Sequence, residues 1–597
     1  MSSSPGPAID PTLQTALEEH RAGRWGRARE AYEAVLARRP DDPDALLLFA
    51  QLLQQTGDSR SAAVVLERLL AVAPSSAAAH YLLGQIYRAR SRLPEAYGCY
   101  SEALRCDPDH AQARFSLGTL YCEREQWREA AQCFREVIRV MPDYAEAHCN
   151  LGTALQECGD FDAALACFHE AIRLKPDYYE AHYNLGNAHK EMGQMGLAIG
   201  KFQDALRLDP DFVPAHGNLG AVFQEHGDLA AAQSSFGEAL RRDPRYVNAR
   251  NGLGLVLAER GAPDEAIAHY RAALRLKPDF PEAHLNLALA LLLKGQLREG
   301  WEEYEWRWRS PSRRSELRHT DKPQWRGEPI RGKTIVLYYE QGLGDTMQFS
   351  RFAPVLARLG ARVLLEVEAP LHDLMRESFR GIETFVKDEA LPPFDYQCPL
   401  LSVPRALGID LATIPAEIPY LSTEPQRAAG WRERLGVAPC LRIGIVWAGS
   451  GTHRYDRNRS VPLEIIAPLF DVAGSEFFTL QKGPAAAALQ HCRTRVIDHA
   501  DLLVSFADTA ALVSCLDLII AVDTAVAHLA GAMGKPVWML TPFAPDWRWL
   551  LEREDTPWYP GLRLFRQRRP DDWGHVIERI RTELADLCGR ARNRSRT

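Results

Sequence analysis

The sequence predicts a fold in two parts, an α-helical solenoid followed by α/β domains built on parallel sheet. Two observations support this division. Prolines recur every 34 residues in the first half, and strand-like apolar runs alternate with helical patterns in the second half. At 597 residues the chain is too long for one hydrophobic core, and its 46% apolar and 25% charged content is typical of globular proteins.

Three kinds of residue mark the repeat. The prolines are Pro40, Pro74, Pro108, Pro142, Pro176, Pro210, Pro244 and Pro278. The glycines that share their period are Gly84, Gly118, Gly152, Gly186, Gly220 and Gly254. The aromatic residues are Tyr100, Phe134, Phe168, Phe202, Phe236, Tyr270 and Tyr304. Apolar residues at i, i+3 and i+4 predict two amphipathic helices in each unit. We expect the small residues to let these helices approach, the aromatic to fill the gap between units, and the proline to end the second helix.

This pattern resembles the tetratricopeptide repeat over about residues 9–314, where eight units match well. No unit can bury its apolar face alone, so we expect the units to stack into a solenoid. A ninth unit, 281–314, begins in the same way but ends in "WEEYEWRWRS", with Arg307 where a small residue is expected. We interpret this unit as a capping or docking repeat.

Asparagines occupy one equivalent position on the first helix of several units, at Asn150, Asn184, Asn218 and Asn286. They resemble the side-chain amide ladder in the repeats of O-linked N-acetylglucosamine transferases, which implies a groove for a protein or peptide partner. The alternative is local polar capping within each unit. Histidines also recur, but units on the order of 10 Å apart cannot share a metal whose ligands must lie about 2 Å from it.

The repeat period is lost after Arg309, and we expect a linker over 315–330. Two blocks of alternating strands and helices follow, at 331–425 and 441–580, and each opens with a strand and a glycine-bearing loop. They predict two Rossmann-like halves facing a cleft, the first on the acceptor side and the second on the donor side. A basic tail, 585–597, is expected to be a disordered end.

The first glycine loop lies in "LYYEQGLGDTMQFSRF", after the apolar run 334–339 and before a helical pattern at about 346–359. Gly342, Gly344 and Asp345 are compatible with a dinucleotide site, a sugar-nucleotide site or a tight turn. A dinucleotide fingerprint needs a third glycine where Met347 stands, and no G-K-[ST] follows for a phosphate loop. Asp345 is a candidate catalytic base, with helix capping as its alternative role.

The second motif is "VDTAVAHLAGAMGKPV", in which a strand ends at Val522 and a helix begins near Thr524. The first turn of such a helix offers free N–H groups and a positive dipole end, which suit a diphosphate. Thr524 adds a hydroxyl, and His528 lies on the same face one turn later. Helix capping by Asp523 and Thr524, and a buried core role for His528, remain the alternatives.

Together "GLGDT" and "VDTAVAHLAGAMGKPV" resemble the ADP-heptose:lipopolysaccharide heptosyltransferase family over about 331–580. The resemblance implies a metal-independent inverting transferase of the glycosyltransferase B-type fold, with Asp345 as base and Asp523, Thr524 and His528 on the donor. "RNRSVP" places Arg459 at the donor phosphate. Gly342, Gly344, Gly449 and Lys482 complete the expected donor site. The first block is shorter than that family's acceptor half, which leaves the acceptor open.

Composition limits the partners. A net charge of −7 offers no general attraction for nucleic acid or a membrane surface, and no apolar run is long enough to span a bilayer. The sequence "MSSSPGPAID" carries no secretory signal, so a cytoplasmic location is expected. We expect a nucleotide-sugar substrate and neither cofactor nor metal. The alternatives are a repeat-based scaffold with a degenerate transferase half and, less favoured, a nicotinamide oxidoreductase that uses the first glycine loop.

Overall fold

The computed structural model describes residues 11–437, 440–451, 456–491 and 496–594. The chain forms two compact units, Met1–Pro244 and Arg245–Thr597. The first unit is entirely helical across its described residues, and the second combines helical repeats with two parallel sheets.

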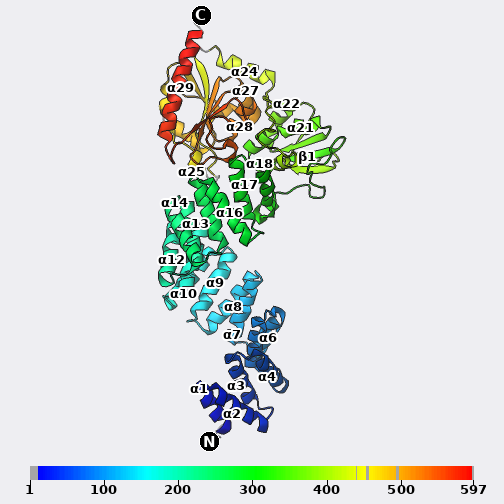
Figure 1. Cartoon of the computed structure of the whole chain (residues 1–597), viewed down its shortest axis with the longest axis vertical. Helices are drawn as coiled ribbons and strands as arrows, with labels where there is room; N and C mark the ends of the chain where they lie inside the picture. Colours follow the sequence, from blue (N-terminus) through cyan, green and yellow to red (C-terminus); the bar gives the residue numbers. More distant parts are fainter. Residues whose placement is uncertain (1–10, 438–439, 452–455, 492–495, 595–597) are drawn as a thin grey trace. The chain divides into compact units, whose positions relative to one another are not determined.

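The first unit consists of seven helix pairs (Figure 1). Their bounds are α1 (Pro11–Arg21), α2 (Trp25–Arg38), α3 (Pro43–Gln55), α4 (Ser59–Val72), α5 (Ala77–Ala89), α6 (Leu93–Cys106), α7 (Ala111–Glu123), α8 (Trp127–Val140), α9 (Ala145–Glu157), α10 (Phe161–Leu174), α11 (Tyr179–Glu191), α12 (Met195–Leu208), α13 (Val213–His226) and α14 (Leu229–Arg242). Each pair packs through the predicted contact. A Cβ added to Gly186 would lie 2.7 Å from the ring of Phe202, so only glycine lets α11 and α12 approach this closely.

The recurring histidines close the turns between repeats. The Nε2–H of His148 donates to the carbonyl of Pro142 at 2.8 Å, and that of His216 donates to Pro210 at 2.9 Å. In each case the proline carbonyl lies six residues before the histidine. The histidine position of the repeat is therefore occupied by a local hydrogen bond, as expected for buried carbonyls that need a partner.

The second unit begins with two further helix pairs. They are α15 (Val247–Glu259), α16 (Pro263–Leu276), α17 (Pro281–Leu293) and α18 (Leu297–Tyr304), followed by η1 (Glu305–Arg309) and α19 (Pro311–Arg314). The helix of the ninth repeat thus tightens into a 3₁₀ turn at the unusual "EWRWR" segment.

Two parallel sheets make up the rest of the second unit. The first contains β1 (Thr334–Tyr338), β2 (Arg362–Val367), β3 (Glu383–Val386) and β4 (Tyr396–Pro399), in the order β3-β2-β1-β4. The second contains β5 (Leu441–Val446), β6 (Ser475–Thr479), β7 (Val496–Asp498), β8 (Leu518–Val522), β9 (Val537–Thr541) and β10 (Leu562–Arg566), in the order β10-β9-β8-β5-β6-β7. Both orders reverse beside the opening strand, which is the doubly wound arrangement.

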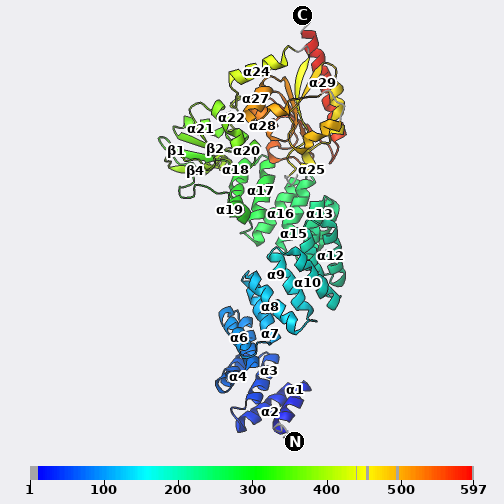
Figure 2. The ribbon, with the colours of Figure 1, turned by 180° about the vertical axis from the view of Figure 1, so that it is seen from behind.

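Helices cover both faces of the second sheet. Ile520 of β8 lies in the core formed with α29 (Trp573–Arg594), which runs along one face of the sheet (Figures 1 and 2). Its neighbour Ile519 points into the other core, together with α27 (Phe506–Ser514) and α28 (Ala525–Ala532). The two-residue alternation of a strand therefore supplies both cores.

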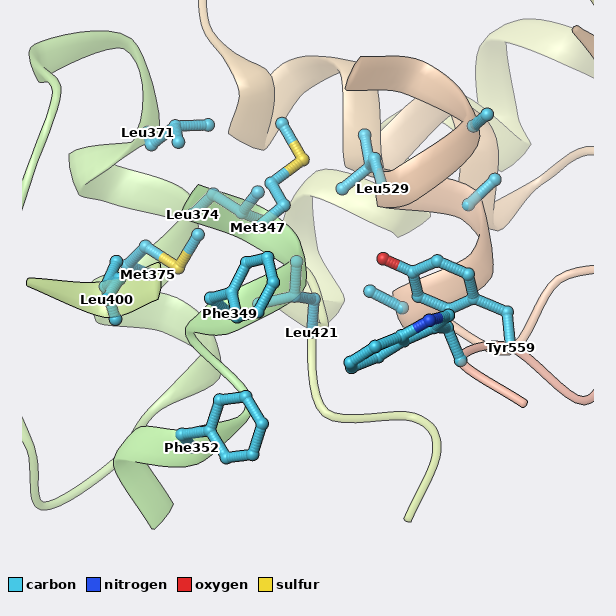
Figure 3. Close-up of a cluster of buried hydrophobic side chains, with 14 of the residues drawn as sticks. Met347, Phe349, Phe352, Leu371, Leu374, Met375, Leu400, Leu421, Leu529 and Tyr559 are labelled. Carbon is cyan, nitrogen blue, oxygen red and sulfur yellow. The ribbon is translucent and has the colours of Figure 1, made fainter. Parts of the chain in front are cut away.

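One apolar core joins the ninth repeat, the first sheet and one face of the second sheet. It includes Trp301 of α18, Met347 and Phe349 of α20 (Leu343–Phe349), and Leu529 of α28. Figure 3 shows Met347 and Phe349 in the same cluster as Leu529 and Tyr559. The two halves are therefore packed against each other rather than tethered by a flexible connection.

Three expectations need correction. The tail predicted to be disordered is helical as far as Arg594, because α29 continues and buries Cys588 against the second sheet. The helix expected at about 346–359 is two short helices, α20 and α21 (Phe352–Arg358), since Pro354 has no N–H for the carbonyl of Ser350. The segment 315–330 is packed rather than free, with Trp325 buried and its amide bonded to the carbonyl of Gln397.

Candidate functional site

The two glycine-bearing motifs of the second half lie in direct contact. The 342–345 loop follows β1 where the first sheet reverses its strand order, and α28 follows β8 at the corresponding point of the second sheet. A Cβ on Gly344 would lie 2.9 Å from Cδ2 of His528 and 3.5 Å from Cα of Ala525. Carboxyl ends of parallel strands at such switch points are where ligands bind in doubly wound sheets.

Asp345 has both of its carboxylate oxygens engaged. It occupies the third position of α20, and its Oδ2 accepts the Gly342 N–H at 3.1 Å. Its Oδ1 is paired with the guanidinium of Arg548. The capping role and a position at the contact between the halves therefore coexist in this residue.

Arg548 is the hub of the site, and the sequence analysis did not identify it. It lies in η7 (Trp547–Trp549) after β9, and only 7% of its surface is exposed. Besides Asp345, its guanidinium donates to Asp546 at 2.8 Å and to Gln348 Oε1 at 2.6 Å. Burial disfavours its charge, but Asp546 and Asp345 outweigh burial and raise the pKa of Arg548.

Asp523 is held as a carboxylate at the end of β8. Its Oδ2 accepts the indole N–H of Trp549 at 2.8 Å, and its Oδ1 lies 3.7 Å from Nε2 of His528. Burial raises the pKa of Asp523, but His528, Trp549 and Arg548 together lower it to about 2. Trp549 and Trp547 are themselves buried, so they pack in the core as the alternative interpretation expected, and Trp549 also orients Asp523.

The start of α28 leaves backbone donors free for a ligand. Thr524 is the residue before the helix, but its side chain makes no capping bond and turns back to the Val522 carbonyl at 3.3 Å. Among the hydrogen bonds of the described residues, none uses the amides of Ala525 and Val526. His528 is 5% exposed, and its Nδ1 hydrogen-bonds the hydroxyl of Tyr559 at 2.9 Å.

Arg459 reaches this position from the loop after β5. Its Nη1 donates to the backbone carbonyl of Asp523 at 3.0 Å, and its Nε donates to Asp456 at the same distance. Gly449 lies beneath it, and a Cβ there would meet the guanidinium at 2.5 Å from Nη2. Lys482 is the exception, because its ammonium bonds the Leu503 carbonyl and no contact of the described residues links it to the others.

A second buried acid lies beside the first glycine loop. Glu368 follows β2 and accepts the hydroxyl of Thr346 at 2.9 and 3.1 Å. Burial is the main cause that raises the pKa of Glu368 to about 7, and the charge of Asp345 adds to it. The sequence marked Glu368 only as a possible ribose ligand in the disfavoured nicotinamide reading.

The predicted groove asparagines bond to the preceding repeat. Nδ2 of Asn218 donates to Oδ1 of Asn187 at 2.7 Å, and Nδ2 of Asn286 donates to Oδ1 of Asn251 at 3.0 Å. Asn184 makes a longer contact with Thr153 at 3.4 Å. The amides therefore link neighbouring repeats, while their half-buried side chains keep acceptor oxygens that these bonds do not use.

Two searches of the described part of the chain bear on metals and membranes. No group of three or more histidine, cysteine or acidic side chains there has an arrangement that could hold a metal ion. No described helix has both the length and the apolar character that crossing a bilayer requires.

The residues that the sequence missed share one weak signal. Arg548 stands between two tryptophans just after β9, and Gln348 lies three residues beyond Asp345. An arginine inside an aromatic segment after a strand is a common surface feature, so sequence alone could not separate it from an exposed residue. Its importance depends on the approach of two loops 203 residues apart.

Comparison with known proteins identifies the helical units. Models of the tetratricopeptide repeat match residues 19–86, 75–143, 154–193, 179–212, 218–281 and 263–300. The chain therefore carries tetratricopeptide repeats across its first 300 residues, and repeats of this kind support a protein or peptide partner.

One curated relative and several solved structures are similar to the chain. Protein FlbA of Caulobacter vibrioides is 28% identical over 322 residues, which are 49% of this chain and 53% of FlbA, so the match spans about half of each protein. The Cut9–Hcn1 hetero-tetramer of APC/C is similar over 47% of this chain and 55% of that chain, at 20% identity and a TM-score of 0.37. YrrB, a TPR protein with an unusual peptide-binding site, is similar over 31% of this chain and 95% of its own, at 20% identity and a TM-score of 0.26.

Proposed function

We propose that this chain is a metal-independent, inverting glycosyltransferase of the B-type fold that uses a nucleotide-diphosphate sugar, and that its repeats recruit a protein or peptide acceptor. One observation carries the proposal. An acid (Asp345), a histidine (His528) and the free first turn of α28 converge at the contact between two doubly wound sheets. That combination supplies a proton acceptor and an anion site side by side.

The reaction assigned to these residues is a single displacement. The acceptor hydroxyl attacks the anomeric carbon, its proton passes to Asp345, and the nucleoside diphosphate departs with the bonding electron pair. The amides of Ala525 and Val526 and the guanidinium of Arg459 would receive the leaving charge. Asp523 would orient His528 rather than contact the diphosphate, since two anions would repel each other.

The first test is thermal stability of the purified chain with ADP, UDP, GDP, NADH and common sugar conjugates of the diphosphates. A ligand that binds only the folded protein raises its melting temperature. We expect one nucleoside diphosphate to stabilise the wild-type chain and to lose this effect in His528→Ala and Arg459→Gln. Tyr559→Phe, which keeps the histidine, and Arg569→Gln, which changes an exposed arginine, serve as matched controls.

The second test concerns the base. Asp345→Asn keeps the size of the side chain and removes its proton affinity, so glycosylation of the native acceptor should fall by at least about 100-fold. Undiminished transfer in this variant would show that Asp345 is not the base. Stabilisation by NADH alone would instead favour the oxidoreductase.

A second candidate is a repeat-based scaffold whose transferase half no longer turns over. The observation in its favour is the pairing of Asp345 with Arg548, which occupies the acid in this structure. The two candidates differ in nucleotide binding. If none of the diphosphates or their sugar conjugates stabilises the folded chain, the scaffold becomes the better assignment.

A further inference from the structure

We propose that Arg307, a residue of the ninth repeat, is a positioning residue for the candidate transferase site, so that this repeat forms part of the site's construction. The inference concerns how the 342–345 loop is held. Its effect on nucleotide binding rests on the proposed function, whereas its effect on the loop itself does not.

Arg307 is 1% exposed, and all five of its N–H donors have acceptors. It donates to both carboxylate oxygens of Glu340, at 2.7 and 3.0 Å, and to the hydroxyl of Ser402 at 2.7 Å. The remaining donors reach Glu305 at 2.9 Å and the Tyr304 carbonyl at 3.0 Å. A guanidinium that is saturated by its own protein has no donor left for a ligand, so its role is to hold other groups in place.

The groups that Arg307 holds lie at the carboxyl ends of two neighbouring strands. Glu340 is two residues after β1 and two residues before Gly342, and its Oε1 also accepts the Leu401 N–H at 3.1 Å. Ser402 follows β4, the strand beside β1. Arg307 therefore joins the ends of β1 and β4 at the point from which the first glycine loop leaves the sheet.

A second contact from the same repeat reinforces this position. The hydroxyl of Tyr304 accepts the amide N–H of Gln341 at 2.6 Å, one residue before Gly342. On the far side of the loop, Trp301 packs edge-on against Trp547, the neighbour of Arg548, with ring centroids 5.2 Å apart. The ninth repeat thus contacts both segments whose approach brings Asp345 to Arg548.

The charges are consistent with a permanent pair. Burial alone would disfavour the guanidinium charge, but Glu340 and Glu305 outweigh burial and raise the pKa of Arg307. Arginine also fits the bidentate geometry of Glu340, which a lysine ammonium cannot reproduce. The earlier repeats carry a small apolar residue at this position, such as Ala239 and Ala273, so the network is specific to the ninth repeat.

The test measures local hydrogen exchange in the full-length chain. In Arg307→Gln and in the milder Tyr304→Phe, amides of residues 340–349 should exchange faster, by about tenfold in the arginine variant, with β8 unchanged. Arg307→Lys should lie between the wild type and Arg307→Gln. Arg309→Gln, which removes an exposed arginine two residues away, is the control and should leave the loop as in the wild type.

Three outcomes decide the inference. Faster exchange confined to the loop, together with at least tenfold weaker binding of the stabilising nucleoside diphosphate, supports it. Faster exchange throughout residues 245–597, or unchanged exchange in 340–349, overturns it and leaves Arg307 as a general stability residue. Should ADP, UDP and GDP all fail to bind the wild-type chain, the proposed function fails, while the loop measurement still decides the role of Arg307.

Discussion

The sixth and the ninth repeats follow one sequence pattern but bury different kinds of surface. In the sixth, Gly186 lies against Phe202, and Ala205 occupies the small position that follows. In the ninth, the corresponding residues are Ala288, Tyr304 and Arg307, and the last of these is buried in an ionic network. A repeat that packs only on similar repeats needs apolar contact, whereas one that packs on a sheet can also hold polar strand ends.

The charges of the two regions differ in the same way. Arg173 and Glu170 in the first unit form a pair with side chains 65% and 37% exposed, where water screens the attraction. Arg307 and Glu340 are 1% and 0% exposed. The free energy of the first pair is small, but loss of one partner from the second leaves a charge without water or a counterion.

The largest expected effect comes from breaking the buried pair. Arg307→Met leaves Glu340 unpaired and should lower the free energy of unfolding of the second unit by about 3–5 kcal/mol. The double variant Arg307→Met/Glu340→Leu should recover most of this loss. Chemical denaturation of both variants measures the difference. Arg173→Met in the first unit should change stability by less than about 1 kcal/mol, and an equal loss there would contradict the contrast.

The next effect is a pH dependence that the exposed charges of the repeats lack. The pKa of Glu368 is raised from 4.5 to about 7, so the unfolded chain gives up this proton first. The stabilising contribution is complete below about pH 4.5 and is lost as the pH rises to about 7, by about 3 kcal/mol. Glu368→Gln, which stays neutral, should therefore gain stability over the wild type at pH 8 and match it near pH 4.5.

Urea denaturation at these two pH values, followed by the signal of the second unit, provides the measurement. Glu383→Gln removes an exposed carboxylate from the same sheet and is the matched control. A pH-independent difference between Glu368→Gln and the wild type would mean that the carboxyl is not held protonated by the fold.

A smaller effect tests the contact between paired helices. Gly186→Ala places a methyl group 2.7 Å from Phe202 and should destabilise the first unit by about 1–3 kcal/mol. Gly200→Ala, in the partner helix α12, meets open space and should stabilise by about 0.5–1 kcal/mol. Thermal unfolding of the two variants compares them directly, and the same sign in both would refute the packing explanation.

The smallest effect concerns the amide ladder. Asn218→Ala removes two hydrogen bonds to the preceding repeat, to Asn187 and to the Tyr183 hydroxyl, and should lower stability by about 0.5–1.5 kcal/mol. Gln203→Ala, an exposed amide in the same unit, should be neutral. If the ladder also binds a partner, an asparagine variant will weaken capture of that partner by more than its loss of stability explains.

The repeats could be predicted in detail because each depends on its own 34 residues and its neighbours. Gly186 and Phe202 are 16 residues apart, so their contact is written into the period. The predicted parallel strands are also present, since apolar runs of this length favour buried strands. The nucleotide-sugar chemistry, the base role of Asp345 and the peptide groove stay predictions.

The candidate site was predictable only in part. The glycine loops and the residues at the start of α28 are local features of strand ends, and the structure brings Gly344, Asp345, Asp523, Thr524, His528, Gly449 and Arg459 together or into a chain of contacts. Lys482 stands apart from them among the described contacts. Arg548 was missed because its partner Asp345 is 203 residues away.

The sequence by itself determined the repeat, its period, the parallel strands and the position of the glycine-bearing loops, because these depend on local spacing and on burial of one face. Only the tertiary structure decided that Arg307 reaches Glu340, that Arg548 pairs with Asp345, and that the basic tail continues as a helix. Each of those outcomes depends on which distant surface a segment meets, and a charge is held in the interior only where that surface supplies its partner.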